Sequence, residues 1–287
     1  MVFSFPKVVK ELIPKFSERD YRVLNTRLFI SCWVGFALDQ SLKTIRDLFK
    51  RPNQGGVDLD ISTFSKANQH RSLKPFQELY QQVLGLVKQK KAIGKGKNCE
   101  LDDYEICPID SAIITLTSKL LWALRYHQVK LLTVLNNASR TGEHPLIHFG
   151  QEHDYKFATQ MTENLAQKQV RVMNRGFTAL EYLKQLQEQK KHFVIRANTN
   201  YKLEPLESGE WQEGTGKKQG IYRVVWFCAL ETKTEYRIFT NLPQTISNQE
   251  VAEFYRQRWQ IELSLKFLKM HLKLDHLISK SPNGITI

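Results

Sequence analysis

The sequence has few cysteines, and their spacing indicates neither disulfides nor a metal site. Its 287 residues include four cysteines, which lie far apart and form no Cys-x-x-Cys pair. Disulfide-rich domains and zinc modules carry cysteines at close, regular spacings. The pattern excludes both and is typical of reduced cytoplasmic thiols. The four are Cys32, Cys99, Cys107 and Cys228.

Long hydrophobic runs are also absent. The longest run, residues 28–38, contains Ser31 and Gly35 and is shorter than the roughly 20 apolar residues that a membrane-spanning helix needs. Pro6 and Lys7 interrupt the start of the chain, so no secretory signal is expected. We therefore expect a cytoplasmic protein without a membrane partner.

Acidic residues are scarce relative to basic ones. The chain has 42 Lys and Arg against 29 Asp and Glu, a net charge of +13 and an isoelectric point near 9.5. Such an excess favours a polyanionic partner, either nucleic acid or an anionic membrane surface. A generically basic protein would have the same composition, so charge alone does not decide.

The stretch that follows Ser247 has the pattern of a long helix. Ser247 and Glu250 fit a capping box, and no proline or glycine follows until Pro282. One helix is predicted over about residues 248–274.

Four polar side chains of this helix would share one face, because about 100° per residue places them in a strip roughly 60° wide. Apolar residues flank the strip on both sides. Such a group is costly to bury without a ligand or partner. Two interpretations stay open: a buried ion network that braces the helix, or an active site. The four are Tyr255, Arg258, Glu262 and Lys269.

The spacing of these residues, Tyr-x2-Arg-x3-Glu-x6-Lys, resembles the YREK signature of bacterial insertion-sequence transposases of the fourth family. Three other segments are similar to that family in the same order. They are ICPIDSAIITLTSKLLW with Asp110, VRVMNRGFTALEYLKQL with Asn174, and FTNLP at residues 239–243. The resemblance covers the chain from about Asp39 to its C-terminus.

The resemblance implies a DDE-type enzyme of the α/β class, with an RNase H-like core, a β-rich insertion and a small helical N-terminal domain. In the family, three carboxylates hold two divalent ions, Mg²⁺ or Mn²⁺, for an in-line displacement at a phosphodiester. The matching catalytic and metal positions are Asp110, Asn174 and Glu262. Arg258 and Lys269 would contact phosphates near the scissile bond, and Tyr255 would contact the DNA backbone.

The chain departs from the family at one catalytic position. Asn174 stands where the family has its second aspartate. Its amide oxygen can ligate a metal but carries no charge, which lowers the affinity of the site for the ions. We expect a protein that binds DNA and cleaves it slowly or not at all. Family members usually continue beyond the point where this chain ends, so the resemblance also implies a truncated copy.

Runs of β-forming residues predict four strands in the core, of which the first three suit an antiparallel meander and the last a parallel strand. A β-rich block with the turn-like stretch LESGEWQEGTGKKQG would separate Asn174 from Glu262. The predicted strands are 106–114, 129–135, 146–149 and 170–173, and the predicted helices are 157–166 and 177–190.

Five regions are expected along the chain. They are a helical DNA-binding domain at 1–87, a basic linker at 88–101, the first part of the core at 102–192, the insertion at 193–241, and the rest of the core with the catalytic helix at 242–287.

The N-terminal region could carry a DNA-reading module. Leu38, Leu42 and Leu48 recur at helical spacing, and Ser62 would cap a second helix, STFSKANQHR. That helix would expose donors able to contact phosphates or base edges. The link of about eleven residues is longer than the turn of a helix-turn-helix, so a plain helical bundle remains an alternative. The donors are Lys66, Asn68, Gln69 and Arg71.

Three functions stay open: an active transposase, a non-catalytic DNA-binding remnant or regulator, and a structural α/β protein. The first two imply double-stranded DNA as partner, at the terminal inverted repeats and the target, and a location at the nucleoid. Pairing two ends also implies a homodimer.

Overall fold

The computed structural model describes residues 11–12, 21–44, 46–49, 58–92, 104–115, 128–213, 220–229, 233–274, 277, 279 and 281–287. The chain forms two compact units. Unit 1 comprises Met1–Lys95, Ile114–Val129 and Lys266–Ile287, and unit 2 comprises Gly96–Ile113 and Lys130–Leu265.

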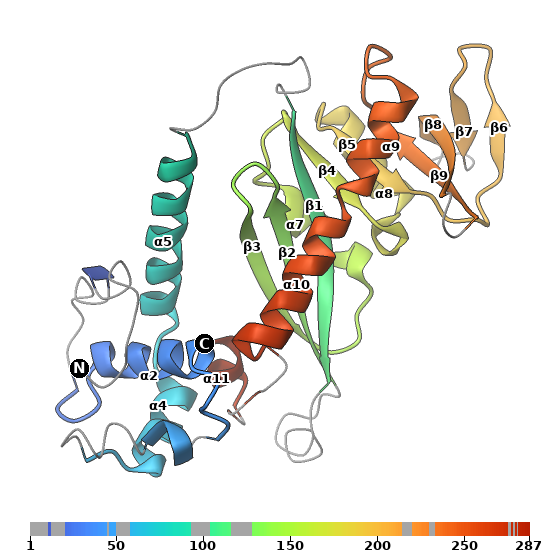
Figure 1. The fold of residues 1–287 in the computed structure, drawn as a ribbon. Coiled ribbons are helices and arrows are strands. Elements are labelled where there is room, and N and C mark those ends of the chain that lie inside the picture. The colour runs from blue at the N-terminus through green and yellow to red at the C-terminus, as the bar shows by residue number, and fades with distance from the viewer. Residues whose placement is uncertain are drawn as a thin grey trace. The chain divides into compact units, whose positions relative to one another are not determined.

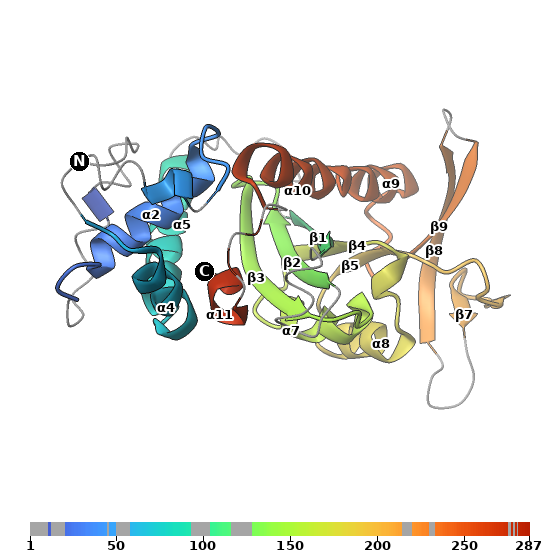
Figure 2. The same ribbon diagram turned by 90° about the horizontal axis from the view of Figure 1, so that it is seen from below.

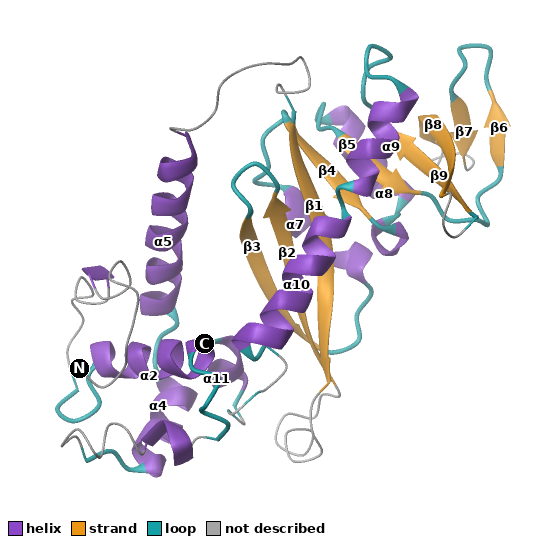
Figure 3. Cartoon of the chain, viewed as in Figure 1, coloured by secondary structure: helices purple, strands orange, loops and turns teal. Residues whose placement is uncertain are grey.

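Most of unit 2 is built on a nine-stranded sheet with the order β3-β2-β1-β4-β5-β9-β8-β7-β6 (Figures 1 and 3). β1 pairs in parallel with β4, and β4 with β5, whereas β9, β8, β7 and β6 continue the sheet as antiparallel neighbours. The strands are β1 (Glu105–Thr115), β2 (Gln128–Asn136), β3 (Thr141–Phe149), β4 (Gln169–Met173), β5 (Phe193–Arg196), β6 (Leu203–Pro205), β7 (Trp211–Glu213), β8 (Gly220–Ala229) and β9 (Thr234–Thr240).

These strands confirm the four predicted in the core and the β-rich block that follows. β1, β2 and β3 are neighbours in chain order, and β4 joins β1 in parallel, as expected. The turn-like interpretation of LESGEWQEGTGKKQG was wrong in part, because Trp211–Glu213 forms β7. The remainder of that stretch at 214–219, together with Cys99 and most of the basic linker, lies outside the described residues.

Helices cover the two faces of the sheet, as Figure 2 shows: α7 and α8 on one, α9 and the start of α10 on the other. Side chains alternate between faces along a strand. Cys107 and Ile109 of β1 accordingly join a core cluster with α7 and α8, whereas Ile106 joins a second cluster with α9. This alternation turns Asp110, an even-numbered residue of β1, toward the face of α9.

The helices of this region are shorter than expected. The predicted helices 157–166 and 177–190 are each a 3-10 turn followed by a short α-helix. Their bounds are η3 (Asp154–Phe157), α7 (Ala158–Thr162), η4 (Arg175–Phe177) and α8 (Leu180–Glu188).

The single helix predicted over 248–274 was also wrong, because the structure divides it into α9 (Asn248–Arg256) and α10 (Trp259–Leu272). The capping box of Ser247 and Glu250 is confirmed. At the break, the N–H of Arg258 donates to Tyr255 O at 3.0 Å, and the N–H of Ile261 donates to Arg258 O at 3.2 Å. These bonds to the third preceding residue tighten the turn and interrupt the α-helical pattern.

Unit 1 has its own apolar core, to which α2 (Thr26–Leu38), α4 (Ile61–His70) and α5 (Lys74–Ala92) contribute, and α11 (Pro282–Thr286) contacts α4. A helix across Leu38, Leu42 and Leu48 was a wrong prediction, since α2 ends at Leu38. The cap of α4 was also misassigned: Asp60, not Ser62, accepts the N–H groups of the first turn. In the described part of the chain, no helix has the length and apolarity needed to cross a membrane.

Candidate functional site

The register of the parallel strands brings Asp110 and Asn174 together. Ile109 of β1 is the partner of Met173 of β4. Asp110 follows Ile109 and Asn174 follows Met173, the last residue of β4, so both lie at the same end of these strands. The Nδ2 of Asn174 donates a hydrogen bond to Oδ1 of Asp110 at 3.0 Å. Two residues that are 64 apart in the chain thus meet through strand pairing.

Asn174 is held in this orientation by the turn that it starts. Its Oδ1 accepts the N–H of Gly176 at 2.7 Å, as the cap of η4. A Cβ at Gly176 would lie only 2.9 Å from that Oδ1, so the close approach requires glycine. The amide consequently presents its N–H group, rather than its oxygen, to Asp110.

Arg258 joins Asp110 to Glu262. Its Nη1 lies 3.0 Å from Oδ2 of Asp110, and its Nη2 donates to Oε1 of Glu262. Arg258 stands at the break between α9 and α10, and Glu262 lies one turn later. The guanidinium therefore bridges a carboxylate of β1 and a carboxylate of α10. Asp110 also contacts Asn174, so the three residues form one group.

Burial and neighbouring charges shift the pKa values of Asp110 and Arg258. Burial raises the pKa of Asp110, and the charges of Glu262 and Asp154 raise it further, whereas the Ser111 N–H and Arg258 oppose the rise. Burial alone would lower the pKa of Arg258, but Tyr255, Glu262 and Asp110 together raise it. The guanidinium remains positive, and it stabilises two carboxylates that would otherwise repel each other.

The ring of Tyr255 lies beside the guanidinium of Arg258. Tyr255 is buried, with 7% of its surface exposed, and its ring centroid is 5.7 Å from the Arg258 guanidinium carbon. Phe227 and Tyr236 pack against it. This aromatic group supports one side of the arginine. Lys269 lies two turns beyond Glu262 on α10 and is half-buried.

The residues expected on α4 differ in exposure. Lys66 is exposed, but the expectation that Asn68 is exposed was wrong. Asn68 is 3% exposed, and its Oδ1 accepts the Trp33 indole N–H at 3.0 Å. Arg71 is half-buried and stacks on Tyr21, 3.9 Å from the ring centroid. Contact with DNA by Asn68 or Arg71 stays a prediction.

Asp154 was missed from the sequence. Its Oδ2 accepts the hydroxyl of Ser111 at 2.8 Å, and its Oδ1 pairs with Lys130 at 2.7 Å. Ser111 directly follows Asp110, so Asp154 lies beside the same group. The run QEHDYKF matches no motif. Asp154 is identified only by its contact with Ser111 in the folded protein.

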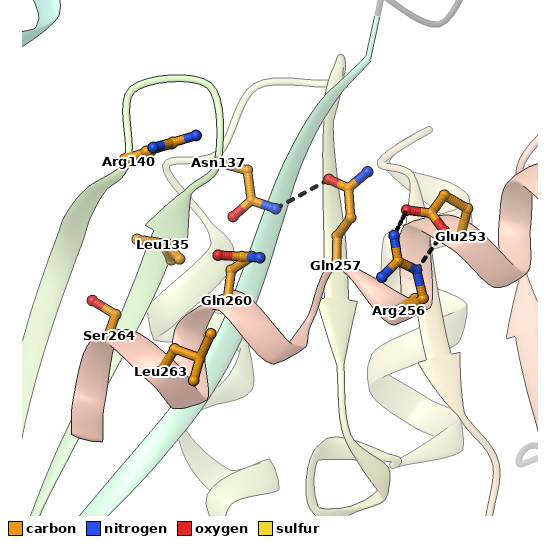
Figure 4. A pocket seen from close by; sticks show the side chains of 9 residues that line it. All are labelled: Leu135, Asn137, Arg140, Glu253, Arg256, Gln257, Gln260, Leu263 and Ser264. Atoms are coloured by element: carbon orange, nitrogen blue, oxygen red, sulfur yellow. Dashed lines mark hydrogen bonds and ion pairs between the residues drawn. The ribbon is translucent and has the colours of Figure 1, made fainter. Parts of the chain in front are cut away.

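A separate hollow, about 530 Å³ in volume, lies between the turn that follows β2 and the outer side of α9 and α10 (Figure 4). Asn137 donates to Gln257 across it at 3.3 Å, and Arg256 pairs with Glu253 at 2.6 Å. The group around Asp110 does not line this hollow.

The carboxylates of Asp110 and Glu262 are oxygen ligands of the kind that Mg²⁺ and Mn²⁺ prefer. The amide oxygen of Asn174 is a third ligand of this kind, but here it accepts the N–H of Gly176. Asp110 and Glu262 both pair with the guanidinium of Arg258, so a positive charge already lies between the two carboxylates. Among the described residues, no three His, Cys, Asp or Glu side chains form a complete metal-binding group in this arrangement. These oxygens could hold a divalent ion only if Arg258 moved away from Asp110 and Glu262.

Comparisons with known proteins agree on one family. The family model described as transposase DDE domain matches residues 102–287. A Synechocystis protein named as a transposase for insertion sequence element IS4SA is 42% identical over 294 residues, which covers 100% of this chain and 85% of that protein.

Two further relatives match shorter parts. A Geobacillus stearothermophilus protein named for element IS5377 is 28% identical over 47% of this chain and 39% of its own length. The Escherichia coli transposase for element IS421 is 46% identical over 61 residues, 21% of this chain and 16% of that protein.

Proposed function

Because this chain belongs to the transposase DDE domain family, we propose that it is an insertion-sequence transposase that cleaves and joins DNA strands at the ends of its element. One observation carries the proposal: Asp110 contacts Asn174 directly and Glu262 through Arg258. The three positions that correspond to the catalytic residues of the family thus converge from β1, from the end of β4 and from α10.

The sheet supports an RNase H-like core. Its order β3-β2-β1-β4-β5, with β4 parallel to both β1 and β5, suits that architecture. β6 to β9 would then form the insertion between Asn174 and Glu262, and β5, which lies within the range 193–241 expected for the insertion, would belong to the core. The helices of unit 1 would supply the N-terminal DNA-binding domain, and Lys66 and Gln69 on α4 are exposed candidate contacts.

In the reaction, Asp110 and Glu262 would hold the divalent ions, and Asn174 would offer an amide oxygen. Bound there, the ions would activate water or a 3′-hydroxyl and stabilise the leaving oxygen of an in-line displacement. Arg258 would turn from the carboxylates toward a phosphate near the scissile bond, and Lys269 would contact a neighbouring phosphate. Tyr255 would hold Arg258 near the DNA backbone.

Asn174 limits this activity in two ways. It contributes no negative charge, and in the present arrangement it turns an N–H group toward Asp110. Both properties weaken the hold on a cation. A catalytically inactive remnant that still binds element ends is therefore the second candidate function.

The partner is double-stranded DNA, which the net charge of +13 attracts. We expect the protein to act at the nucleoid in the cytoplasm, as a homodimer, because two element ends must be brought together.

The test is the Asn174→Asp variant on DNA that carries the inverted repeats bracketing the reading frame. We expect wild type and variant to bind this end equally in gel-shift assays. The variant should nick it at least about tenfold faster with Mg²⁺ or Mn²⁺, because the third carboxylate is restored. Asn174→Asp combined with Glu262→Gln is the matched control and should remain inactive. A variant that binds the end and shows no gain in metal-dependent cleavage would refute the catalytic assignment.

A further inference from the structure

Asp154 is linked to the catalytic group through Ser111. The N–H of Ser111 donates to Oδ1 of Asp110 at 2.9 Å, and its hydroxyl donates to Oδ2 of Asp154 at 2.8 Å. One residue thus orients both carboxylates. Asp154 also begins η3, which packs against η4, the turn that holds Asn174.

Gly176 shows how near Asp154 lies to Asn174. A Cβ built at this glycine would lie 2.9 Å from Oδ1 of Asn174 and 3.7 Å from Oδ2 of Asp154. The two oxygens therefore flank the same point at the edge of the site. A carboxylate lies next to the position where the family's aspartate is replaced by an amide.

The side chain of Asp154 is only 17% exposed, and its partner Lys130 is 8% exposed. Lys130 also donates to the carbonyl of Glu152. A buried pair of this kind can simply brace β2 against η3. If the pair is only structural, removal of Lys130 should weaken the site as much as removal of Asp154. If Asp154 acts in the site, removal of Lys130 should leave cation binding unchanged or strengthen it.

We propose that Asp154 supplies the third negative charge of the site, in place of the charge that Asn174 lacks. The inference rests on the proposed function, because it concerns the cations that the site would attract. Asp154 is a positioning residue: its negative charge attracts the cation through space, and its hydrogen bond with Ser111 orients Asp110. Direct contact between Asp154 and the ion is not required.

The test measures Mn²⁺ binding to the full chain without DNA, by the electron paramagnetic resonance signal of free Mn²⁺. The variants are Asp154→Asn, Lys130→Gln, Asn174→Asp and the double variant Asp154→Asn with Asn174→Asp. Circular dichroism and thermal melting show whether each variant is folded.

Asp154→Asn should weaken Mn²⁺ binding about tenfold or more, because it removes a charge near the ion in a partly buried site. Lys130→Gln should bind Mn²⁺ as tightly as wild type or more tightly, because it removes an opposing charge. The double variant should return to within about threefold of wild type, since it exchanges one carboxylate for another.

Several results would overturn the inference. A loss of less than tenfold in folded Asp154→Asn would do so, and so would equal losses in Asp154→Asn and Lys130→Gln, which indicate a structural brace. If Asp154→Asn does not fold, a double variant that folds without recovering Mn²⁺ binding would overturn it as well. Mn²⁺ binding in Asn174→Asp but not in wild type would refute the role of Asp154 and leave the proposed function intact. Binding in neither protein would refute both.

Discussion

At the scale of single residues, Arg258 links the two carboxylates of the site. Its guanidinium lies between the carboxylates of Asp110 and Glu262 and balances charge that burial would otherwise penalise. The guanidinium must move away from both carboxylates if a divalent cation binds them. Arg258 lies between the end of α9 and the start of α10, so its backbone is not part of a continuous α-helix that would oppose this movement.

The cysteines give a prediction on pH and reactivity. Burial raises the pKa of Cys32 to about 12, whereas Cys228 is exposed. Only the thiolate reacts with alkylating reagents, and at pH 8 the Cys32 thiolate would be roughly one part in ten thousand. Iodoacetamide at pH 8 followed by peptide mapping should label Cys228 and leave Cys32 unlabelled in the folded protein. Equal labelling of both before unfolding would contradict the burial of α2.

The positions in the site could be predicted from the sequence, but their partners could not. Asp110, Asn174 and Glu262 stand in segments with a recognisable order and spacing. Asp154 and Lys130 carry no such pattern, and they reach the site only because β2 and η3 lie beside β1 in space. The burial of Asn68 was missed for a similar reason, since its partner Trp33 is on another helix.

Among the elements, the segment from α7 to β4 depends on one buried arginine. Arg171 of β4 has 0% of its surface exposed. Its guanidinium donates to four backbone carbonyls, those of Thr162, Leu165, Ala166 and Gln169. Thr162 is the last residue of α7, Leu165 and Ala166 lie in the link that follows, and Gln169 is the first residue of β4. β4, which leads into Asn174, is thereby tied to the helix that precedes it.

Arg171→Leu should destabilise the protein by about 3 kcal/mol, because buried carbonyls lose their donors. The measurement is the urea midpoint of unfolding, followed by circular dichroism. Arg22→Leu is a matched control, since Arg22 is exposed, and its midpoint should change little. Similar midpoints for the two variants would show that the bonds of Arg171 do not stabilise this segment.

Element boundaries were harder to predict than the elements themselves. The core strands follow from runs of β-formers, and the capping box of Ser247 and Glu250 follows from residue identity. The break at Arg258 has no local signal, because no proline or glycine is present. It accompanies the tertiary contacts of Arg258 with Asp110 and Glu262, which helix propensity does not include.

At the scale of the whole molecule, the family and the α/β class were predictable, because ordered motifs and strand patterns extend over most of the chain. The sheet order was not derivable from local patterns, since the β1 to β4 pairing joins segments separated by two other strands. That pairing, rather than any single motif, brings the proposed reaction centre together. Transposase activity would therefore depend on the folded sheet as much as on the signature residues.

The most direct test is a crystal structure of Asn174→Asp grown with Mn²⁺ and measured for anomalous scattering. We predict an anomalous peak within about 2.3 Å of carboxylate oxygens of both Asp110 and Glu262, with Arg258 displaced from between them. A structure in which Arg258 still bridges the two carboxylates, with Mn²⁺ absent from them, would contradict the assignment of this group as the reaction centre.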